Sequence, residues 1–330
     1  MSEKRSASEK QSQAMEHAVV TGGAGFLGSH LVDSLLEDGC RVTVLDNYGS
    51  GRPENLSHVE SSQLTVQKHD VRDTFPEFDD VDIVYHLASR ASPDDFGSHA
   101  VEIAMTNSQG TERALECARE YDARALIAST SEVYGNPEEH PQSETYNGNV
   151  NIRGPRAPYD ESKRFSEALA VAYEQKYRMD IRTVRIFNTY GPRMDPHDGR
   201  VIPNFLSQAI RGEDLTIYGD GSQTRSFCYV SDLISGIRNV ADAPPEAAAG
   251  DVFNVGNTEE ISIQTLAEVI LKVVDTDSGV TYKSLPQDDP EVRRPDIFKI
   301  TSELSWEPSI SLRTGLERTV PYFEGRLADD

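Results

Sequence analysis

Short apolar segments alternate with amphipathic ones through the first half of the chain. Runs rich in β-branched and other apolar residues predict six strands, at 17–21, 41–46, 64–66, 82–86, 125–128 and 181–187. Apolar positions three and four residues apart predict helices near 25–38, 98–121 and 159–178. Strands that alternate with helices imply a parallel sheet covered on both faces. This half therefore predicts a Rossmann-type, doubly wound α/β fold.

The pattern loosens after residue 187 and predicts a smaller α/β lobe. It indicates short strands at 215–218, 227–230 and 251–255, helices near 202–211 and 263–274, a surface loop at 241–250, and a loop-rich end with a final helix at 284–330. We expect residues 17–186 with 226–257 to form the large domain, and 187–225 with 258–330 the lobe. The polar segment 1–16 is expected to be a disordered tail.

A glycine-rich turn joins the first strand to the first helix. Gly22, Gly25 and Gly28 have the spacing that lets a pyrophosphate approach the backbone at a helix N-terminus. Asp46 ends the second strand, 18 positions after Gly28, where an acidic side chain binds ribose hydroxyls and repels a 2′-phosphate. The motif predicts a dinucleotide site that prefers NAD to NADP, a preference that the nearby Arg52 weakens.

Tyr159 and Lys163 are four residues apart on a predicted helix, so both side chains face one cleft. Ionising half of a tyrosine at pH 7 requires a pKa about three units below the usual value near 10, or about 4 kcal/mol. One cation at about 4 Å and an effective dielectric near 20 supplies about that much. We therefore predict that Lys163 and a positive nicotinamide ring lower the pKa of Tyr159 enough for it to act as a base.

Polar residues follow the strand at 125–128, in the stretch Ser129 to Gly135. Ligands of open α/β sheets bind just beyond the carboxyl ends of the strands. The hydroxyls of Thr130 and Ser131 are therefore expected to hydrogen-bond a reacting oxygen, and the carboxylate of Glu132 to relay protons.

Together these three motifs resemble the extended short-chain dehydrogenase/reductase (NAD-dependent epimerase/dehydratase) family, whose members epimerise, dehydrate or decarboxylate nucleotide sugars. The resemblance covers the chain from residue 17 onward. Four stretches resemble the UDP-glucuronate decarboxylases in particular: 139–156, 185–194, 220–227 and 288–296. The first and last discriminate, whereas the middle two also occur in related epimerases and dehydratases.

The resemblance implies a role for each matching residue. The implied catalytic group is Tyr159 as base, with Thr130 at the sugar 4-oxygen, Ser131 and Glu132 for proton transfer, Lys163 at the nicotinamide ribose, and Arg293 near the sugar carboxylate. The implied UDP site is Asn188, Arg200, Val201, Tyr218, Gln223 and Arg225, with Arg293 beside it. The implied NAD site is Gly22, Gly25, Phe26, Leu27, Gly28, Asp46, Asn47, Ser50, Gly51, Asp70, Val71, Leu87, Ser89, Thr106, Tyr159 and Lys163.

The implied reaction converts UDP-glucuronate to UDP-xylose through a 4-keto sugar, with NAD regenerated. Alternatives remain: a 4-epimerase or 4,6-dehydratase on the same scaffold, a dehydrogenase that releases NADH, or a non-catalytic NAD-binding regulator. Two positions depart from the decarboxylase pattern, Arg90 in place of proline and Arg113 in place of asparagine, and both are expected to border the sugar pocket.

Composition narrows the possible partners and location. The net charge of −23 disfavours nucleic acid and anionic membranes. No apolar run approaches the roughly 20 residues needed to span a bilayer, and no apolar signal-peptide core is found, so a cytoplasmic location is expected. The three cysteines have no C-x-x-C spacing and the eight histidines no H-x-x-x-H pair, so no metal site is expected. The long helices near 98–121 and 159–178 suggest a homodimer through a helix bundle, as in the family.

The charge also suggests a habitat. Only eight of the 32 basic residues are lysine, and 55 residues are acidic, which is typical of a halophilic protein. We predict that folding and activity need high salt, because screening relieves repulsion between carboxylates. Thermal melts over a range of salt concentrations test this, and full stability at low ionic strength would contradict it.

Overall fold

The computed structural model describes residues 17–284 and 292–328. The expected tail at 1–16 and residues 288–291 of the last decarboxylase-like stretch lie outside this range. Seven parallel strands form one sheet in the order β11-β6-β5-β4-β1-β2-β3. They are β1 (His17–Thr21), β2 (Arg41–Asp46), β3 (Leu64–Lys68), β4 (Ile83–His86), β5 (Arg124–Thr130), β6 (Ile181–Ile186) and β11 (Val252–Val255). The predicted parallel sheet is confirmed.

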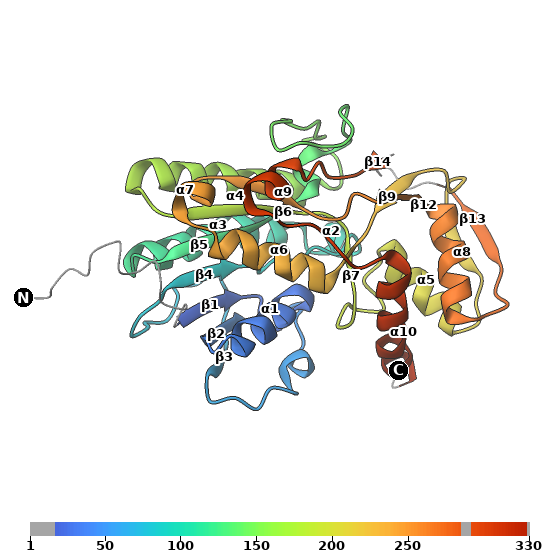
Figure 1. The fold of residues 1–330 in the computed structure, drawn as a ribbon, viewed down its shortest axis with the longest axis horizontal. Helices are drawn as coiled ribbons and strands as arrows, with labels where there is room; N and C mark the ends of the chain where they lie inside the picture. The colour runs from blue at the N-terminus through green and yellow to red at the C-terminus, as the bar shows by residue number, and fades with distance from the viewer. Residues whose placement is uncertain (1–16, 285–291, 329–330) are drawn as a thin grey trace, which may run out of the picture.

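Helices cover both faces of this sheet (Figure 1). Helices α1 (Phe26–Glu37) and α6 (Val230–Asp242) pack together on one face, and α3 (Ala100–Glu120) and α4 (Ala157–Tyr177) on the other. Neighbouring strand residues point to opposite faces, so Val20 joins the core under α1 and α6, whereas Val19 joins the core under α3 and α4. Strands buried on both faces explain the continuous apolar runs in the sequence, and the fold is the expected doubly wound one.

The smaller lobe lies to the right of the sheet in Figure 1. Its helices α5 (Val201–Ile210), α8 (Ile263–Val274) and α10 (Leu312–Ala328) pack against one another. Strand β8 (Leu215–Tyr218) pairs with β13 (Val280–Lys283), and β9 (Thr224–Ser226) pairs with both β12 (Glu260–Ser262) and β14 (Val292–Arg293). The remaining elements are short: η2 (Pro53–Leu56), α2 (Asp95–Ser98), η3 (Ser131–Tyr134), β7 (Thr189–Tyr190), β10 (Cys228–Tyr229), α7 (Pro245–Ala248) and α9 (Phe298–Leu304). The exact division of the chain between large domain and lobe stays a prediction.

The sequence pattern misassigned the segment around α6. The strand expected at 227–230 ends at Tyr229, and Val230 already begins α6, a helix whose bounds the pattern did not give. The surface loop expected at 241–250 holds the end of α6 and the short helix α7, and Ala248 is buried. Strands β9, β12 and β14 were missed because two or three residues are too few to show a period.

Candidate active site

The turn between β1 and α1 has the shape of a phosphate cradle. Gly22 has a φ of +70°, and a Cβ there would lie 2.8 Å from the Cα of Ala88. A Cβ on Gly28 would lie 2.1 Å from the carbonyl oxygen of Gly22, so no other residue fits. Helix α1 then begins at Phe26 with no acidic residue in its first turn. Its first N–H groups are therefore available to an anion.

Asp46 faces this turn from the end of β2. Its carboxylate accepts hydrogen bonds from the backbone N–H of Ala24 (3.0 Å) and of Tyr48 (2.8 Å). Burial raises the pKa of Asp46, and these two hydrogen bonds oppose the shift. A Cβ on Gly51 would lie 2.7 Å from the same carboxylate. The loop after β2 thus folds back over Asp46 at the glycine turn.

Other expected cofactor residues meet at the same end of the sheet. Asn47, Ser50 and Gly51 follow β2, Asp70 and Val71 follow β3, Leu87 and Ser89 follow β4, and Thr106 lies on α3. Asn47 donates a hydrogen bond to Asp70 (3.3 Å). The Ser89 hydroxyl is buried and has no partner among the described residues. The glycine cradle, Asp46 and this unpartnered hydroxyl fit a dinucleotide.

Tyr159 and Lys163 lie on α4 and are both buried. The Phe96 ring stacks on Tyr159 with the ring centroids 4.9 Å apart, and Lys163 Nζ donates to the carbonyl of Ala128 (2.8 Å). Burial raises the pKa of Tyr159 to about 12, against a hydrogen bond with Thr130 and the charge of Arg200. Burial also lowers the pKa of Lys163 to about 8. Lys163 therefore does not by itself bring the tyrosine into the range of a base.

Glu132 lies between two arginines just beyond β5. Its carboxylate accepts hydrogen bonds from Arg156 Nη2 (2.5 Å) and Arg293 Nη2 (3.2 Å). Burial acts to raise the pKa of Glu132, but the charges of Arg293 and Arg156 outweigh it and lower the pKa to about 2. Arg293 is 1% exposed, and its Nη1 also donates to the carbonyl oxygen of Ser131 (2.5 Å). The predicted catalytic loop and Arg293 therefore meet.

The smaller lobe brings two of the expected substrate residues near this cluster, since the charge of Arg225 acts on Glu132 and that of Arg200 on Tyr159. Strand pairing places Arg293 on β14 beside Arg225 on β9. Arg200 precedes Val201 at the start of α5, and its Nη2 donates to the carbonyl oxygen of Ala91 (2.7 Å). Two further residues of this group, Asn188 and Tyr218, lie after β6 and at the end of β8, and Gln223 Nε2 donates to the Tyr218 carbonyl oxygen (2.6 Å). Their assignment to UDP stays a prediction.

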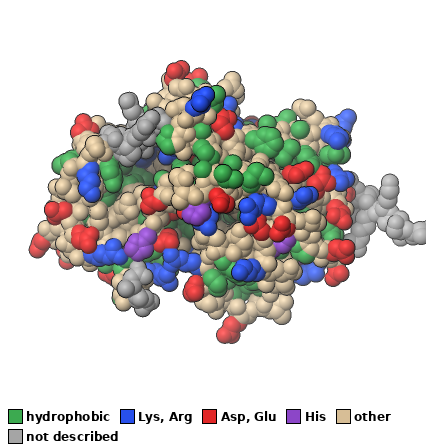
Figure 2. Space-filling view, turned by 180° about the vertical axis from the view of Figure 1, so that it is seen from behind, with side chains coloured by type: hydrophobic (Ala, Val, Ile, Leu, Met, Phe, Trp, Pro, Cys, Tyr) green, Lys and Arg blue, Asp and Glu red, His purple; other side chains and the backbone are tan. Residues whose placement is uncertain are grey.

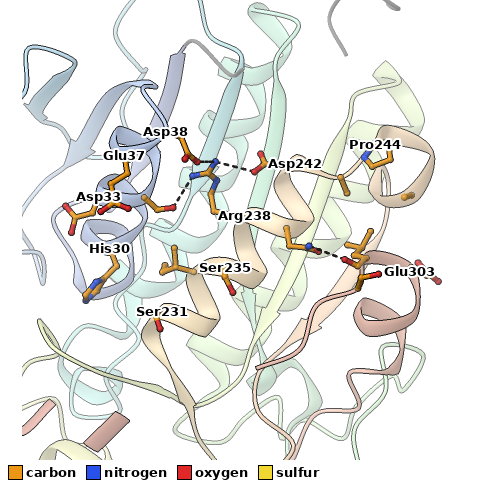
Figure 3. A pocket seen from close by; sticks show the side chains of 17 residues that line it. His30, Asp33, Glu37, Asp38, Ser231, Ser235, Arg238, Asp242, Pro244 and Glu303 are labelled. Carbon is orange, nitrogen blue, oxygen red and sulfur yellow. Dashed lines mark hydrogen bonds and ion pairs between the residues drawn. The ribbon is translucent and has the colours of Figure 1, made fainter. Parts of the chain in front are cut away.

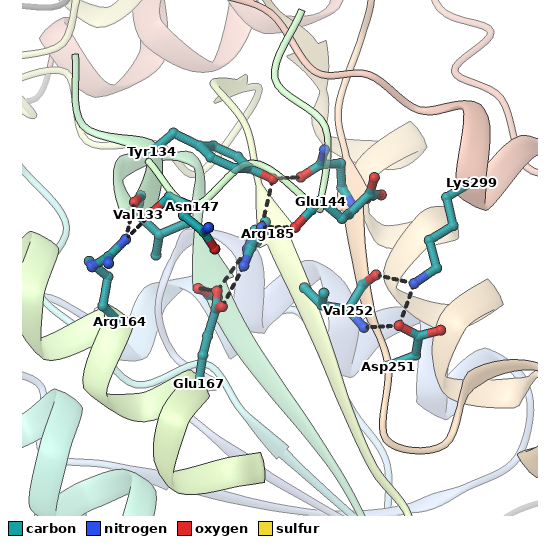
Figure 4. A network of polar contacts seen from close by, with 12 residues as sticks. Val133, Tyr134, Glu144, Asn147, Arg164, Glu167, Arg185, Asp251, Val252 and Lys299 are labelled. Carbon is teal, nitrogen blue, oxygen red and sulfur yellow. Dashed lines mark hydrogen bonds and ion pairs between the residues drawn. The ribbon is translucent and has the colours of Figure 1, made fainter. Parts of the chain in front are cut away.

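Sequence reasoning missed a second layer of charges along α4. Arg185 on β6 forms an ion pair with Glu167 (2.7 Å), as Figure 4 shows. The Glu167 carboxylate also accepts a hydrogen bond from the Ser129 hydroxyl (2.5 Å). Arg156, the N-cap residue of α4, and Asp160 lie about one turn apart on the same helix face. Lys163 follows about one turn after Asp160, and Glu167 one turn after Lys163. Charged residues at 156, 160, 163 and 167 are spaced three or four apart, which was the available signal.

Arg90 lies on the cofactor side of the site. Its Nη2 is 3.0 Å from the point that a Cβ on Gly49 would occupy, in the loop after β2. Its Nη1 contacts Asp95 (3.3 Å). Arg113, the other departure from the expected pattern, lies on α3.

A cavity of about 930 Å³ lies elsewhere, between α1, α6 and α9 (Figure 3). Acidic side chains such as Asp33, Glu37 and Asp242 line it, and Arg238 bridges Asp38 and Asp242. None of the expected catalytic, cofactor or substrate residues lines this cavity. Within residues 17–284 and 292–328 no cluster of histidine, cysteine and acidic residues suits a metal, and no helix is long and apolar enough to cross a membrane.

Comparison with known proteins finds several relatives that are named UDP-glucuronic acid decarboxylase. The chain is 48% identical over 313 residues to UDP-glucuronic acid decarboxylase 1 of Arabidopsis thaliana, covering 94% of this chain and 71% of the relative. It is 46% identical to UDP-glucuronic acid decarboxylase 1 of Xenopus tropicalis, covering 94% and 72%.

Solved structures share the fold at lower identity. UDP-glucose 4-epimerase from Thermotoga maritima, with UDP-glucose, superposes with a TM-score of 0.84 at 30% identity, covering 94% of this chain and 99% of that one. UDP-glucuronic acid 4-epimerase from Bacillus cereus, with UDP-glucuronic acid and NAD, superposes with a TM-score of 0.83 at 28% identity and the same coverage. Residues 18–256 match the model of the NAD dependent epimerase/dehydratase family, and the chain belongs to this family.

Proposed function

We propose that the chain decarboxylates UDP-glucuronate to UDP-xylose, with NAD as its cofactor. The observation that carries the proposal is Arg293, a buried guanidinium beside the catalytic loop and hydrogen-bonded to Ser131 and Glu132. A guanidinium held there suits a sugar carboxylate. Relatives named UDP-glucuronic acid decarboxylase, 43–48% identical over at least 94% of the chain, support the same conclusion.

Tyr159 and Thr130 perform the first step at the sugar 4-oxygen. Tyr159 takes the proton of the 4-hydroxyl, and bound NAD supplies the acceptor for the hydride from C4. The resulting 4-ketone is β to the C6 carboxylate, so CO₂ can leave with the electron pair delocalised onto O4. The hydroxyls of Tyr159 and Thr130 then stabilise that oxyanion as preorganised donors. C5 gains a proton, and reduction of the ketone with return of the Tyr159 proton to O4 completes UDP-xylose.

A 4-epimerase is the nearest alternative. The Bacillus cereus epimerase is solved with UDP-glucuronic acid, so binding of a sugar carboxylate does not by itself identify a decarboxylase. The chain is 28% identical to that epimerase but 48% identical to the Arabidopsis thaliana decarboxylase, which favours decarboxylation. NMR of the products from UDP-glucuronate and NAD⁺ decides between them. If the protein releases no CO₂, an epimerase or a dehydratase activity takes the place of the proposed decarboxylation.

The variant Arg293→Ala tests the role of Arg293 in decarboxylation. Removing one member of a buried charge pair typically costs about 2–5 kcal/mol, which corresponds to roughly a 30- to several-thousand-fold loss of kcat/KM. NAD⁺ binding at the glycine turn should be unchanged in a calorimetric titration. Arg294→Ala, at the next position, is the control and should keep its activity. Near-normal CO₂ release by Arg293→Ala would show that another group holds the carboxylate.

Asp46 predicts that NAD⁺ binds more tightly than NADP⁺. Its carboxylate ends β2 at the glycine turn, where it would repel a 2′-phosphate. Arg52, the residue expected to weaken this preference, forms an ion pair with Asp195. Calorimetric titration of the apoprotein with both dinucleotides should show a preference that shrinks in Asp46→Asn. Equal binding of NADP⁺ to the unmodified protein would refute the assignment.

We also propose a homodimer through α3 and α4. Apolar side chains lie exposed on these helices: Val101, Met105, Phe165 and Val171. Figure 2 shows hydrophobic side chains gathered on the side where α3 and α4 lie. Apolar patches of this kind usually mark interfaces.

Light scattering should give a dimer for the unmodified protein. The variant Phe165→Glu should shift it to a monomer, because a charge buried in the interface is costly. Tyr282→Glu, a similarly exposed aromatic position outside these helices, serves as control. A monomeric unmodified protein would refute the dimer.

A further inference from the structure

Decarboxylation needs a proton that Tyr159 cannot supply, and this inference rests on the proposed function. The C5–C6 bond breaks, its electron pair moves into the enolate, and CO₂ departs. C5 must then gain a proton. The proton that Tyr159 takes from O4 is required again at O4 when the ketone is reduced. A second group must therefore hold a proton in the site at neutral pH.

Glu132 does not meet this requirement, contrary to the expectation that it relays protons. Arg156 and Arg293 donate hydrogen bonds to the same carboxylate oxygen. Their charges overcome the effect of burial and keep the pKa of Glu132 near 2, so the group is ionised. The neighbouring hydroxyls of Thr130 and Ser131 can pass a proton on but cannot store an additional one.

Asp160 is placed and surrounded differently. It follows Tyr159 on α4 and is 5% exposed, and its Oδ1 is buried without a hydrogen-bond partner among the described residues. The charges around it are the carboxylates of Glu132 and Glu161 and the guanidinium groups of Arg156 and Arg293. Burial and Glu132 raise the pKa of Asp160 to about 7, against the two arginines. A carboxyl group that is buried without a full set of partners favours its neutral form.

We propose that Asp160 is the acid that supplies the proton gained by C5. A substrate carboxylate bound near Arg293 adds negative charge to the cluster and competes for its cations, which favours protonated Asp160. When CO₂ departs, that charge passes from the carboxylate to the enolate at C5 and O4, and the arginines that it leaves make Asp160 a stronger acid at the moment when C5 becomes basic. The Asp160 O–H bond breaks, the C5–H bond forms, and solvent returns a proton to Asp160 after each turnover.

Single turnover of the Asp160→Asn holoenzyme with UDP-glucuronate tests the proposal. Reduced cofactor, read by its absorbance, and CO₂ should appear as in the unmodified enzyme, because Tyr159 and Arg293 are retained. UDP-xylose, read by NMR, should form about 10²- to 10⁴-fold more slowly, the usual contribution of a positioned acid. Reduced cofactor should therefore accumulate. Glu161→Gln, the adjacent carboxylate on the same helix with a half-exposed side chain, should behave like the unmodified enzyme.

The pH dependence of the last phase provides an independent readout. The neutral form of Asp160 is the donor, so the rate of C5 protonation in the unmodified enzyme should fall as pH rises above the pKa of that group. This limb should disappear in Asp160→Asn and return in Asp160→Glu. If the Asn variant is unstable, a flat profile of the unmodified enzyme between about pH 6 and pH 9 would still overturn the proposal.

Three further results would each contradict the proposal. Normal formation of UDP-xylose by Asp160→Asn excludes Asp160 as the donor. Absence of reduced cofactor in that variant shows that Asp160 instead supports Tyr159. Failure of the unmodified enzyme to release CO₂ refutes the proposed function itself, and with it the need for this proton.

Discussion

The ion pairs of the partly buried Glu132 with Arg156 and with the fully buried Arg293 are the constraint on which the rest of the site depends. The three groups come from the end of β5, the start of α4 and strand β14 of the smaller lobe. A buried charge without a partner costs several kcal/mol, so each member requires the other two. The cluster therefore fixes where the smaller lobe meets the sheet. It also fixes the protonation states beside the sugar pocket.

Helix α4 carries further paired charges on the side that packs against β5. Lys163 is tied to the carbonyl of Ala128, and Glu167, one turn further, binds Ser129 and Arg185. Glu167 opposes the effect of burial on Lys163, so its carboxylate helps to keep the ammonium charged. Ser129 and Ala128 belong to β5, the strand that also carries Thr130. One helix and one strand thus hold the base, its hydroxyl partner and their supporting charges in a single rigid unit.

Local sequence predicted most of the sheet and the residues whose role follows from spacing. Asp46 contacts the glycine turn, and Tyr159 and Lys163 are both buried on α4, as their short-range patterns predicted. The contact of Glu132 with Arg293 joins residues 161 positions apart, and no local pattern indicates it. The surroundings of Glu132, which decide whether a carboxylate can hold and relay a proton, were for this reason not predicted, and its role stays a prediction. The start of helix α6 was not located because its apolar face begins directly after a strand.

The same cluster gives a physical reason why CO₂ can leave. A guanidinium that bound the substrate carboxylate fully would stabilise the charge that decarboxylation removes, and would slow the step. Arg293 already donates to Ser131 and Glu132, so it offers the substrate only part of its hydrogen-bonding capacity. A substrate carboxylate bound there, as we propose, would be oriented at the ketone but weakly held, and the nearby carboxylate of Glu132 would repel it. An enzyme that shares this fold but must retain the carboxylate requires the opposite balance. We therefore expect the distribution of charge around Glu132, more than the Tyr159–Lys163 pair that starts the reaction, to determine which product this scaffold releases.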